Sequence, residues 1–169
     1  FLISVFFFFF SKSQDRFAYA LTDVNKEGAN WSFLRKVDLK TGAFSEVVLN
    51  GNDASTLGYD DATKKQLLEP LKDARFGTTA NAAFGTGVAA IALDKKNNRL
   101  YYTPMFIDQL RYIDLKTMKV YFVTGSEFTG IKTKATDQSN IVTRMAIGDD
   151  GKGYALTNDA NHLLQFSTG

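Results

Sequence analysis

Hydrophobic and polar residues alternate with a period of two along most of the chain after Gln14. Such alternation, in short runs bounded by polar turn residues, predicts β-strands with one buried face. The chain is also rich in β-branched and aromatic residues within these runs, which favours strands further. The first part of the chain contains three such segments, at 16–23, 32–39 and 44–49.

The middle of the chain gives the clearest pattern. Four short apolar segments, at 87–94, 99–105, 109–115 and 119–125, are separated by connections of a few residues. Short connections between strands indicate an antiparallel meander. The C-terminal part repeats this plan with segments at 141–148, 153–159 and 162–166, and Asp150-Gly151 favours a tight hairpin between the first two of them.

Two stretches nearly copy one another: FLRKVDLKTG from Phe33 and QLRYIDLKTM from Gln109. Both are interpreted as a third strand followed by its exit turn, in which Asp38 and Asp114 accept backbone N–H bonds. A shorter copy, LLQFSTG, begins at Leu163. Aligned on these strands, the apolar positions are Val37, Ile113 and Phe166, and the matching positions of the second strands are Tyr19, Tyr101 and Ala155.

The stretch RLYYTPMFIDQLRYIDLKTMKVYFVTG resembles the repeats of YVTN-type and related β-propellers, and YALTNDANHLLQFSTG resembles the same repeat again. The resemblance implies an all-β propeller fragment of about three four-stranded antiparallel blades, at about 16–50, 88–125 and 141–169. The stretch 51–87 between the first two is expected to be a long loop insertion that holds a short helix at most, because Leu67, Leu68 and Leu71 have helical spacing but Pro70 interrupts them. A cryptic extra blade is the alternative for this stretch.

Three blades do not close a ring, since propellers have about four to eight. The first predicted blade lacks an inner strand and the third lacks an outer one. We therefore expect the remaining blades to belong to the same chain, in a longer parent protein. A chain of three blades alone would expose two flanks that favour association.

The first ten residues, FLISVFFFFF, are the most apolar segment of the chain. They are too short to span a bilayer as a helix but match the apolar region of a secretory signal peptide. Ser11 and Ser13 then occupy the small-residue positions before a cleavage point. Residues 1–13 are therefore interpreted as a signal-peptide remnant. The protein is then expected to be exported (periplasmic, cell-surface or extracellular), with no membrane span in the mature chain. The alternative for residues 1–13 is a buried first strand of the domain.

The amino-acid composition excludes some classes of binding partner and functional site. The chain has 169 residues, no cysteine, and a formal net charge of +2 with acidic and basic residues interspersed. This balance argues against a nucleic-acid surface, which needs clustered basic residues. The missing cysteines exclude disulfides and thiolate-based sites.

Few residues offer binding chemistry. Trp31, the single tryptophan, and Asn30 of the sequon NWS lie in the longer loop of the first predicted blade. His162 is the single histidine and has Asp159 and Asn161 beside it in the connection before the last strand. These five residues are the candidates for contacting a ligand or partner, because blade rims are where propellers bind ligands. No catalytic, cofactor-binding or metal-ligating residue is assigned.

Two classes of function remain open. The first is a non-catalytic exported propeller that binds a protein or glycan through its loop face. The insertion 51–87 would then form part of this binding face, and its removal is expected to leave the fold intact. The second, implied by the resemblance, is a metal-dependent hydrolase or lactonase whose central divalent ion, such as calcium, is held partly outside this chain. A quinone-dependent redox propeller is a third possibility with no motif in its favour.

Overall fold

The computed structural model describes residues 16–23, 31–68, 72–73, 77–78, 83–85, 87–131 and 136–169. In this part of the chain every regular element is a β-strand and none is a helix. The all-β prediction is therefore confirmed. The predicted signal-peptide remnant at 1–13 and the candidate Asn30 lie outside the described residues.

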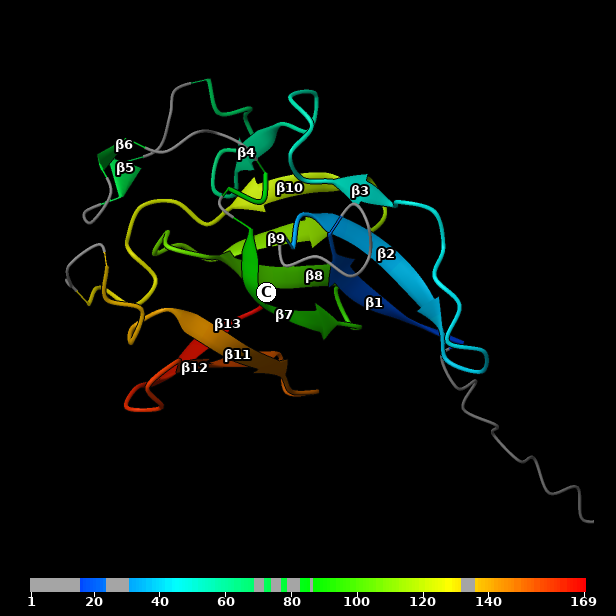
Figure 1. Cartoon of the computed structure of the whole chain (residues 1–169). Coiled ribbons are helices and arrows are strands. Elements are labelled where there is room, and N and C mark those ends of the chain that lie inside the picture. Colours follow the sequence, from blue (N-terminus) through cyan, green and yellow to red (C-terminus); the bar gives the residue numbers. More distant parts are fainter. Residues whose placement is uncertain are drawn as a thin grey trace, which may run out of the picture.

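The strands form three larger sheets and one small hairpin (Figure 1). The first sheet has the order β1-β2-β3 (Phe17–Thr22, Phe33–Asp38, Leu49–Asn50). The second has the order β4-β10-β9-β8-β7 (Gly58–Asp60, Lys119–Phe122, Arg111–Asp114, Arg99–Pro104, Val88–Asp94). The third has the order β11-β12-β13 (Val142–Ile147, Lys152–Thr157, Leu163–Ser167). The hairpin pairs β5 (Lys72–Asp73) with β6 (Gly77–Thr78).

The strands expected from alternation are present, and neighbouring strands within each predicted meander pair antiparallel. The third segment of the first sheet is shorter than expected, because only Leu49 and Asn50 continue the ladder while Phe44 makes an isolated bridge to Val37. The predicted turn chemistry is confirmed as well. The Asp38 carboxylate accepts hydrogen bonds from the backbone N–H groups of Lys40 and Thr41 at 2.9 and 3.0 Å.

The insertion 51–87 differs from the expected loop. Its described residues contain β4, β5 and β6, and β4 adds to the outer edge of the second sheet, parallel to β10. The second sheet thus draws one strand from outside 88–125 and has five strands, not four. The segment at Leu67 and Leu68 contains no helical turn, and Pro70 and Leu71 fall outside the described residues.

Part of the insertion also belongs to the core. Ala83 and Phe84 are fully buried in the apolar cluster between the first two sheets. Phe84 lies edge-to-face against Tyr102, with ring centroids 5.2 Å apart, and the Tyr102 hydroxyl donates a hydrogen bond to the Ala83 carbonyl at 2.5 Å. Because removal of 51–87 would open this cluster, the expectation that it leaves the fold intact does not agree with the structure.

The strand register revises one match of the sequence repeat. Val37, Ile113 and Phe166 pair with Ala18, Leu100 and Gly153 respectively, so these positions are equivalent, as expected. One residue further along, the second strands carry Tyr19, Tyr101 and Tyr154. The equivalent of Tyr101 in the third sheet is therefore Tyr154, and the match to Ala155 was wrong by one residue. A one-residue slip exchanges the two faces of a strand, so this correction decides which side chains meet between sheets.

The three sheets pack in succession, face against face. In Figure 1 the five-stranded sheet lies in the middle, the third sheet (orange to red) lies below β7, and β1 and β2 (blue) lie at its right. One face of the second sheet, with Leu100, Tyr102 and Val120, shares a cluster with Leu34 of the first sheet. The opposite face, with Tyr101 and Tyr112, meets the third sheet at Met145 and Phe166. The core is thus two apolar layers separated by the central sheet.

Candidate functional site

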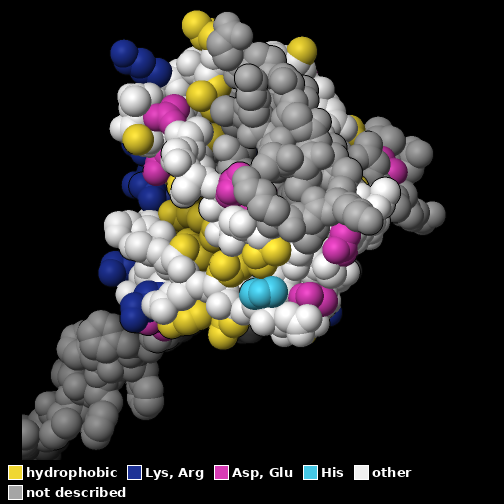
Figure 2. Space-filling model, turned by 90° about the vertical axis from the view of Figure 1, so that its left-hand side faces the viewer, with side chains coloured by type: hydrophobic (Ala, Val, Ile, Leu, Met, Phe, Trp, Pro, Cys, Tyr) yellow, Lys and Arg dark blue, Asp and Glu magenta, His cyan; other side chains and the backbone are white. Residues whose placement is uncertain are grey.

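The connections that lead into β7 and β11 and those that leave β1, β8 and β12 gather at one end of the sheets. Hydrogen bonds tie this loop end together: the Val88 N–H donates to the Trp31 carbonyl at 3.1 Å, and the Thr103 hydroxyl donates to the Val142 carbonyl at 3.2 Å. Figure 2 views the molecule from this end, with the histidine in cyan beside hydrophobic side chains in yellow. The described candidates from the sequence, Trp31 and the turn at 159–162, all belong to it.

Trp31 is 42% exposed and lines an open cavity of about 500 Å³ beside the first strands of the second and third sheets. Leu21 and residues from β7 and β11 complete the lining. An exposed indole at the mouth of a cavity can stack on a ring of a ligand. Its position is therefore compatible with the binding role expected from the sequence.

The Asp159 carboxylate is hydrogen-bonded to residues of its own turn. Its carboxylate accepts hydrogen bonds from the Thr157 hydroxyl at 2.6 Å and from the backbone and side-chain N–H groups of Asn161 at 3.0 and 2.9 Å. The Thr157 bond, followed by the Asn161 backbone bond, lowers the pKa of Asp159. The backbone N–H of His162 donates to the same Thr157 hydroxyl at 3.2 Å. The structure thus brings Asp159, Asn161 and His162 together in one turn, but Trp31 lines a cavity whose lining contains none of the three.

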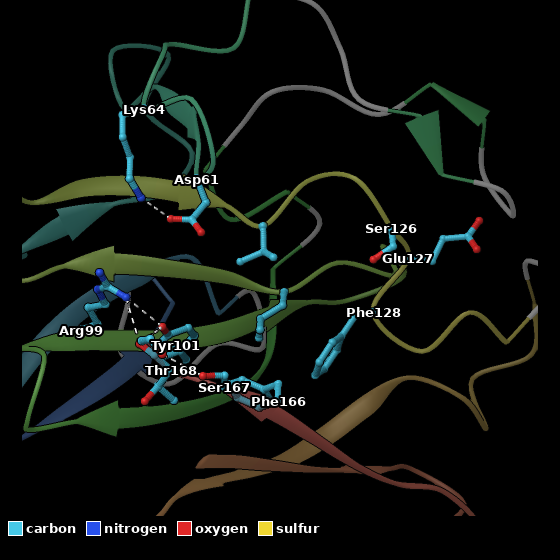
Figure 3. A pocket seen from close by; sticks show the side chains of 13 residues that line it. Asp61, Lys64, Arg99, Tyr101, Ser126, Glu127, Phe128, Phe166, Ser167 and Thr168 are labelled. Atoms are coloured by element: carbon cyan, nitrogen blue, oxygen red, sulfur yellow. Dashed lines mark hydrogen bonds and ion pairs between the residues drawn. The ribbon is translucent and has the colours of Figure 1, made fainter. Parts of the chain in front are cut away.

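A larger cavity, of about 600 Å³, lies between the second and third sheets (Figure 3). We call it the Tyr101 cleft. It extends from the loop end, at Leu110 and Val123, to the opposite end of the strands at Arg99. Tyr101 of β8 forms part of the wall between these ends. The remaining walls come from the turn after β4, the connection after β10 and the end of β13, and comprise Asp61, Lys64, Ser126, Glu127, Phe128, Phe166, Ser167, Thr168 and Gly169.

A ladder of aromatic rings crosses this side of the second sheet. Consecutive ring centroids lie 5.1 to 5.8 Å apart along the series Tyr59, Tyr121, Tyr112, Tyr101, Phe166 and Phe128. These separations are those of favourable aromatic pairs. The four tyrosines stand directly opposite one another on adjacent strands, so their rings share one face of the sheet. The ladder gives the cleft a rigid apolar wall with Tyr101 buried and Phe128 half-buried.

A charged cluster lies beside Tyr112, in the middle of the ladder. The Asp61 carboxylate accepts hydrogen bonds from the Lys64 ammonium and the Tyr112 hydroxyl, each at 2.5 Å. The Arg99 guanidinium lies over the Tyr112 ring, 4.6 Å from its centroid, and donates to the Thr168 carbonyl at 3.0 Å. A cation over an aromatic face is attracted by the ring quadrupole. The Tyr112 ring and the Asp61 carboxylate therefore hold the cationic side chains of Arg99 and Lys64 in place beside the cleft.

These contacts set the charge states of the cluster. Burial raises the pKa of Asp61, but the hydrogen bonds from Lys64 and Tyr112 and the charges of Lys64 and Arg99 outweigh it, so its pKa is lower than usual. Burial, and then the bond donated to Asp61, raises the pKa of Tyr112. The cluster therefore presents the ionised Asp61 carboxylate and the neutral Tyr112 phenol beside the side chains of Lys64 and Arg99, which can bind polar groups of a ligand from several sides.

The sequence contained a signal for this cluster that its interpretation missed. Asp60 and Thr63 repeat the Asp-x-x-Thr spacing of Asp38 with Thr41 and of Asp114 with Thr117. The Asp60 carboxylate accepts the Thr63 N–H at 2.6 Å, as Asp38 does for Thr41, and Tyr59 bridges Gln66. The insertion thus holds another copy of the strand-and-turn phrase, and that copy places Asp61 and Lys64 at the cleft.

The described residues contain neither a metal-ligand cluster nor a membrane-spanning helix. Among the residues that the structure describes, no three His, Asp or Glu side chains gather closely enough to hold a metal ion. In the same part of the chain, no helix has the length and hydrophobicity needed to cross a membrane. Comparison with known proteins identified no matching family model and no similar curated protein.

Proposed function

We propose that this protein is an exported binding module of the β-propeller type that holds a glycan in the Tyr101 cleft. The propeller assignment is supported by three meanders in equivalent register, packed face against face in chain order. Propellers are built from successive small antiparallel sheets packed in this way. Export is supported by the apolar first ten residues and the Ser-Lys-Ser that follows them.

The observation that carries the binding function is the juxtaposition, in one open cavity, of an aromatic wall and a charged cluster. Ligand sites combine apolar and aromatic lining with a few fixed polar groups. Phe128 and Phe166 lie edge-to-face, with centroids 5.6 Å apart, and offer ring surface to the C–H face of a sugar. The carboxylate of Asp61 and the hydroxyl groups of Ser126 and Ser167 supply hydrogen-bonding partners for sugar hydroxyls.

Saturation-transfer NMR with a panel of neutral and acidic oligosaccharides, followed by calorimetric titration of the hits, tests this function. Phe128→Ala and Asp61→Asn should each weaken binding at least about tenfold, which corresponds to about 1.4 kcal/mol. Leu68→Ala is a matched control, since Leu68 is 79% exposed and does not line the cleft. Absence of binding to every oligosaccharide, or equal affinity of Phe128→Ala and the control, would refute the proposal.

A further inference from the structure

The turns that follow β2, β7 and β9 lie at the end of the sheets opposite the loop end. In the second sheet, the register places one row of residues across four strands at this end: Asp94, Arg99, Asp114 and Lys119. Asp38 is the equivalent of Asp114 in the first sheet, where it pairs with Phe17. Figure 1 shows the three turns at the right of the molecule. We call the surface formed by residues 38–44, 94–99 and 114–119 the turn end.

Lysine side chains dominate the turn end. The three turns together contain six basic and three acidic residues. Their exposed cationic side chains are Lys40, Lys95, Lys96, Lys116 and Lys119. Lys40, Lys96 and Lys116 take part in no ion pair within the described part of the chain. Their charges are therefore available to an anionic partner.

The carboxylates of the same turns are engaged by the turns themselves. The Asp114 carboxylate accepts hydrogen bonds from two backbone N–H groups of its turn, at 2.8 and 3.2 Å, as Asp38 does in the first sheet. Asp94 is 2% exposed and accepts the Asn97 N–H at 3.1 Å. The acidic groups are thus buried or half-buried, whereas the lysines extend into solvent. The electrostatic potential outside the turn end is therefore positive.

An exposed apolar side chain lies among these cations. Leu39, in the first of the three turns, is 59% exposed, and its N–H donates to the Arg16 carbonyl at 2.9 Å. Its equivalent in the second sheet, Leu115, packs instead against the apolar cluster between the first two sheets. The Leu39 side chain therefore does not serve the core as Leu115 does, and it is free to contact a partner.

Cations around an exposed aliphatic side chain fit the surface of a bilayer that contains anionic lipids. Lipid phosphates attract the lysines, and the leucine enters the boundary between headgroups and acyl chains. An acidic polysaccharide fits less well, because leucine has no ring to stack on a sugar and the Phe17 ring already holds the Lys36 ammonium, 4.4 Å from its centroid. We propose that the turn end docks the protein peripherally on an anionic lipid bilayer.

The other charges of the molecule favour the same orientation. Glu127, Asp137 and Asp159 are exposed at the loop end, where an anionic surface repels them. The turn of the third sheet exposes Asp149 and Asp150, so the docking surface is confined to the first two sheets. The sheets contact one another through their faces, so the turn end stays exposed if further sheets extend the stack.

Co-sedimentation with vesicles provides the first test. The chain should bind vesicles of phosphatidylcholine and phosphatidylglycerol in equal parts, should dissociate from them as the salt concentration rises, and should not bind vesicles of phosphatidylcholine alone. Lys40→Glu and Lys116→Glu should each weaken binding at least about fivefold, with unchanged circular dichroism. Lys65→Glu is the matched control, because Lys65 is also exposed but lies in the turn after β4, outside the turn end.

Equal binding to both kinds of vesicle, or equal losses for Lys40→Glu and Lys65→Glu, would overturn the proposal. Phe128→Ala, which should weaken glycan binding, should leave vesicle binding unchanged. The docking proposal and the glycan proposal can therefore fail separately.

A fluorescent label at position 39 provides the second test. The chain has no cysteine, so an environment-sensitive fluorophore can be attached to Leu39→Cys without background. Its emission should shift to the blue when the anionic vesicles are added, whereas the same label on Leu68→Cys, at a position that is 79% exposed outside the turn end, should not shift. No shift at position 39, or binding of soluble polygalacturonate without binding of the vesicles, would show that the partner is not a bilayer.

Discussion

Gly51 and Phe84 form the contact through which both ends of the insertion are anchored to the core. Gly51 is buried, its N–H donates to the Ser32 carbonyl at 2.9 Å, and its carbonyl accepts the Phe84 N–H at 3.3 Å. A Cβ atom on Gly51 would lie 2.1 Å from the Cδ2 and Cγ atoms of the Phe84 ring. Because real Cβ contacts are far longer, Gly51→Ala requires the buried ring to move.

Three variants measure this contact. Gly51→Ala overpacks the cluster and should reduce the free energy of unfolding by about 1–3 kcal/mol. Phe84→Ala leaves a cavity and should reduce it by about 3–5 kcal/mol, a shift in Tm of roughly 6–20 °C for a chain of this size. In the double variant the added methyl enters the space vacated by the ring, so the combined loss should fall short of the sum of the single losses by about 0.5–3 kcal/mol.

Urea denaturation followed by circular dichroism and by Trp31 fluorescence provides the free energies. Leu68→Ala is the control for truncation of an exposed side chain and should change stability by less than about 0.5 kcal/mol. If Phe84→Ala costs less than about 1 kcal/mol, or if the two losses add fully, the insertion does not contribute to the core as described. The reasoning on its role would then fail.

Two further predictions concern hydrogen-bonded carboxylates. Removing the hydroxyl in Tyr112→Phe deletes the 2.5 Å hydrogen bond to Asp61. The pKa of Asp61 should therefore rise, and the free energy of unfolding at pH 7 should fall by about 1–3 kcal/mol. NMR titration of the carboxyl carbon and urea unfolding measure these two changes, and an unchanged Asp61 pKa would contradict the assigned contact. The pKa of Asp38 is lowered by the backbone N–H groups of Thr41 and Lys40, so this carboxylate stabilises the fold above its unfolded pKa and the contribution is lost as pH falls through the folded pKa. Asp38→Asn should therefore have a lower urea midpoint than the wild type at pH 7 and an equal one near pH 2, and a difference that persists at low pH would count against it.

Much of the fold could be predicted from the sequence because it depends on residues that are close together. The period of two marks strands wherever one face is buried, and the Asp-x-x-Thr turns form bonds over three residues. These local signals located the strands of the three larger sheets except β4, which lies in the stretch that was expected to be a loop. They also identified the repeat, although not its register in the third sheet. There, Tyr154 and Ala155 were confused because both suit a strand.

The candidate site was predicted only in part. Trp31 was identified as an exposed aromatic residue, and the structure places it at the mouth of a cavity. Asp159 and His162 were identified by residue type alone, and the structure assigns the Asp159 carboxylate to its own turn. The Tyr101 cleft was not predicted. The strand-and-turn phrase at Asp60 and Thr63, which places Asp61 and Lys64, was missed, and the other walls come from segments that only the packing of the sheets brings together.

The sequence by itself determined the strands, their turns and the recurrence of one structural unit, since each rests on interactions between near neighbours. The tertiary structure alone decided that β4 joins β10 and that Phe84 enters the core. It also decided that Tyr112 meets Asp61, which lies 51 positions earlier in the chain. Such contacts follow from how sheets stack and which edges pair. Many distant segments have the same local pattern, and only their packing together selects among them.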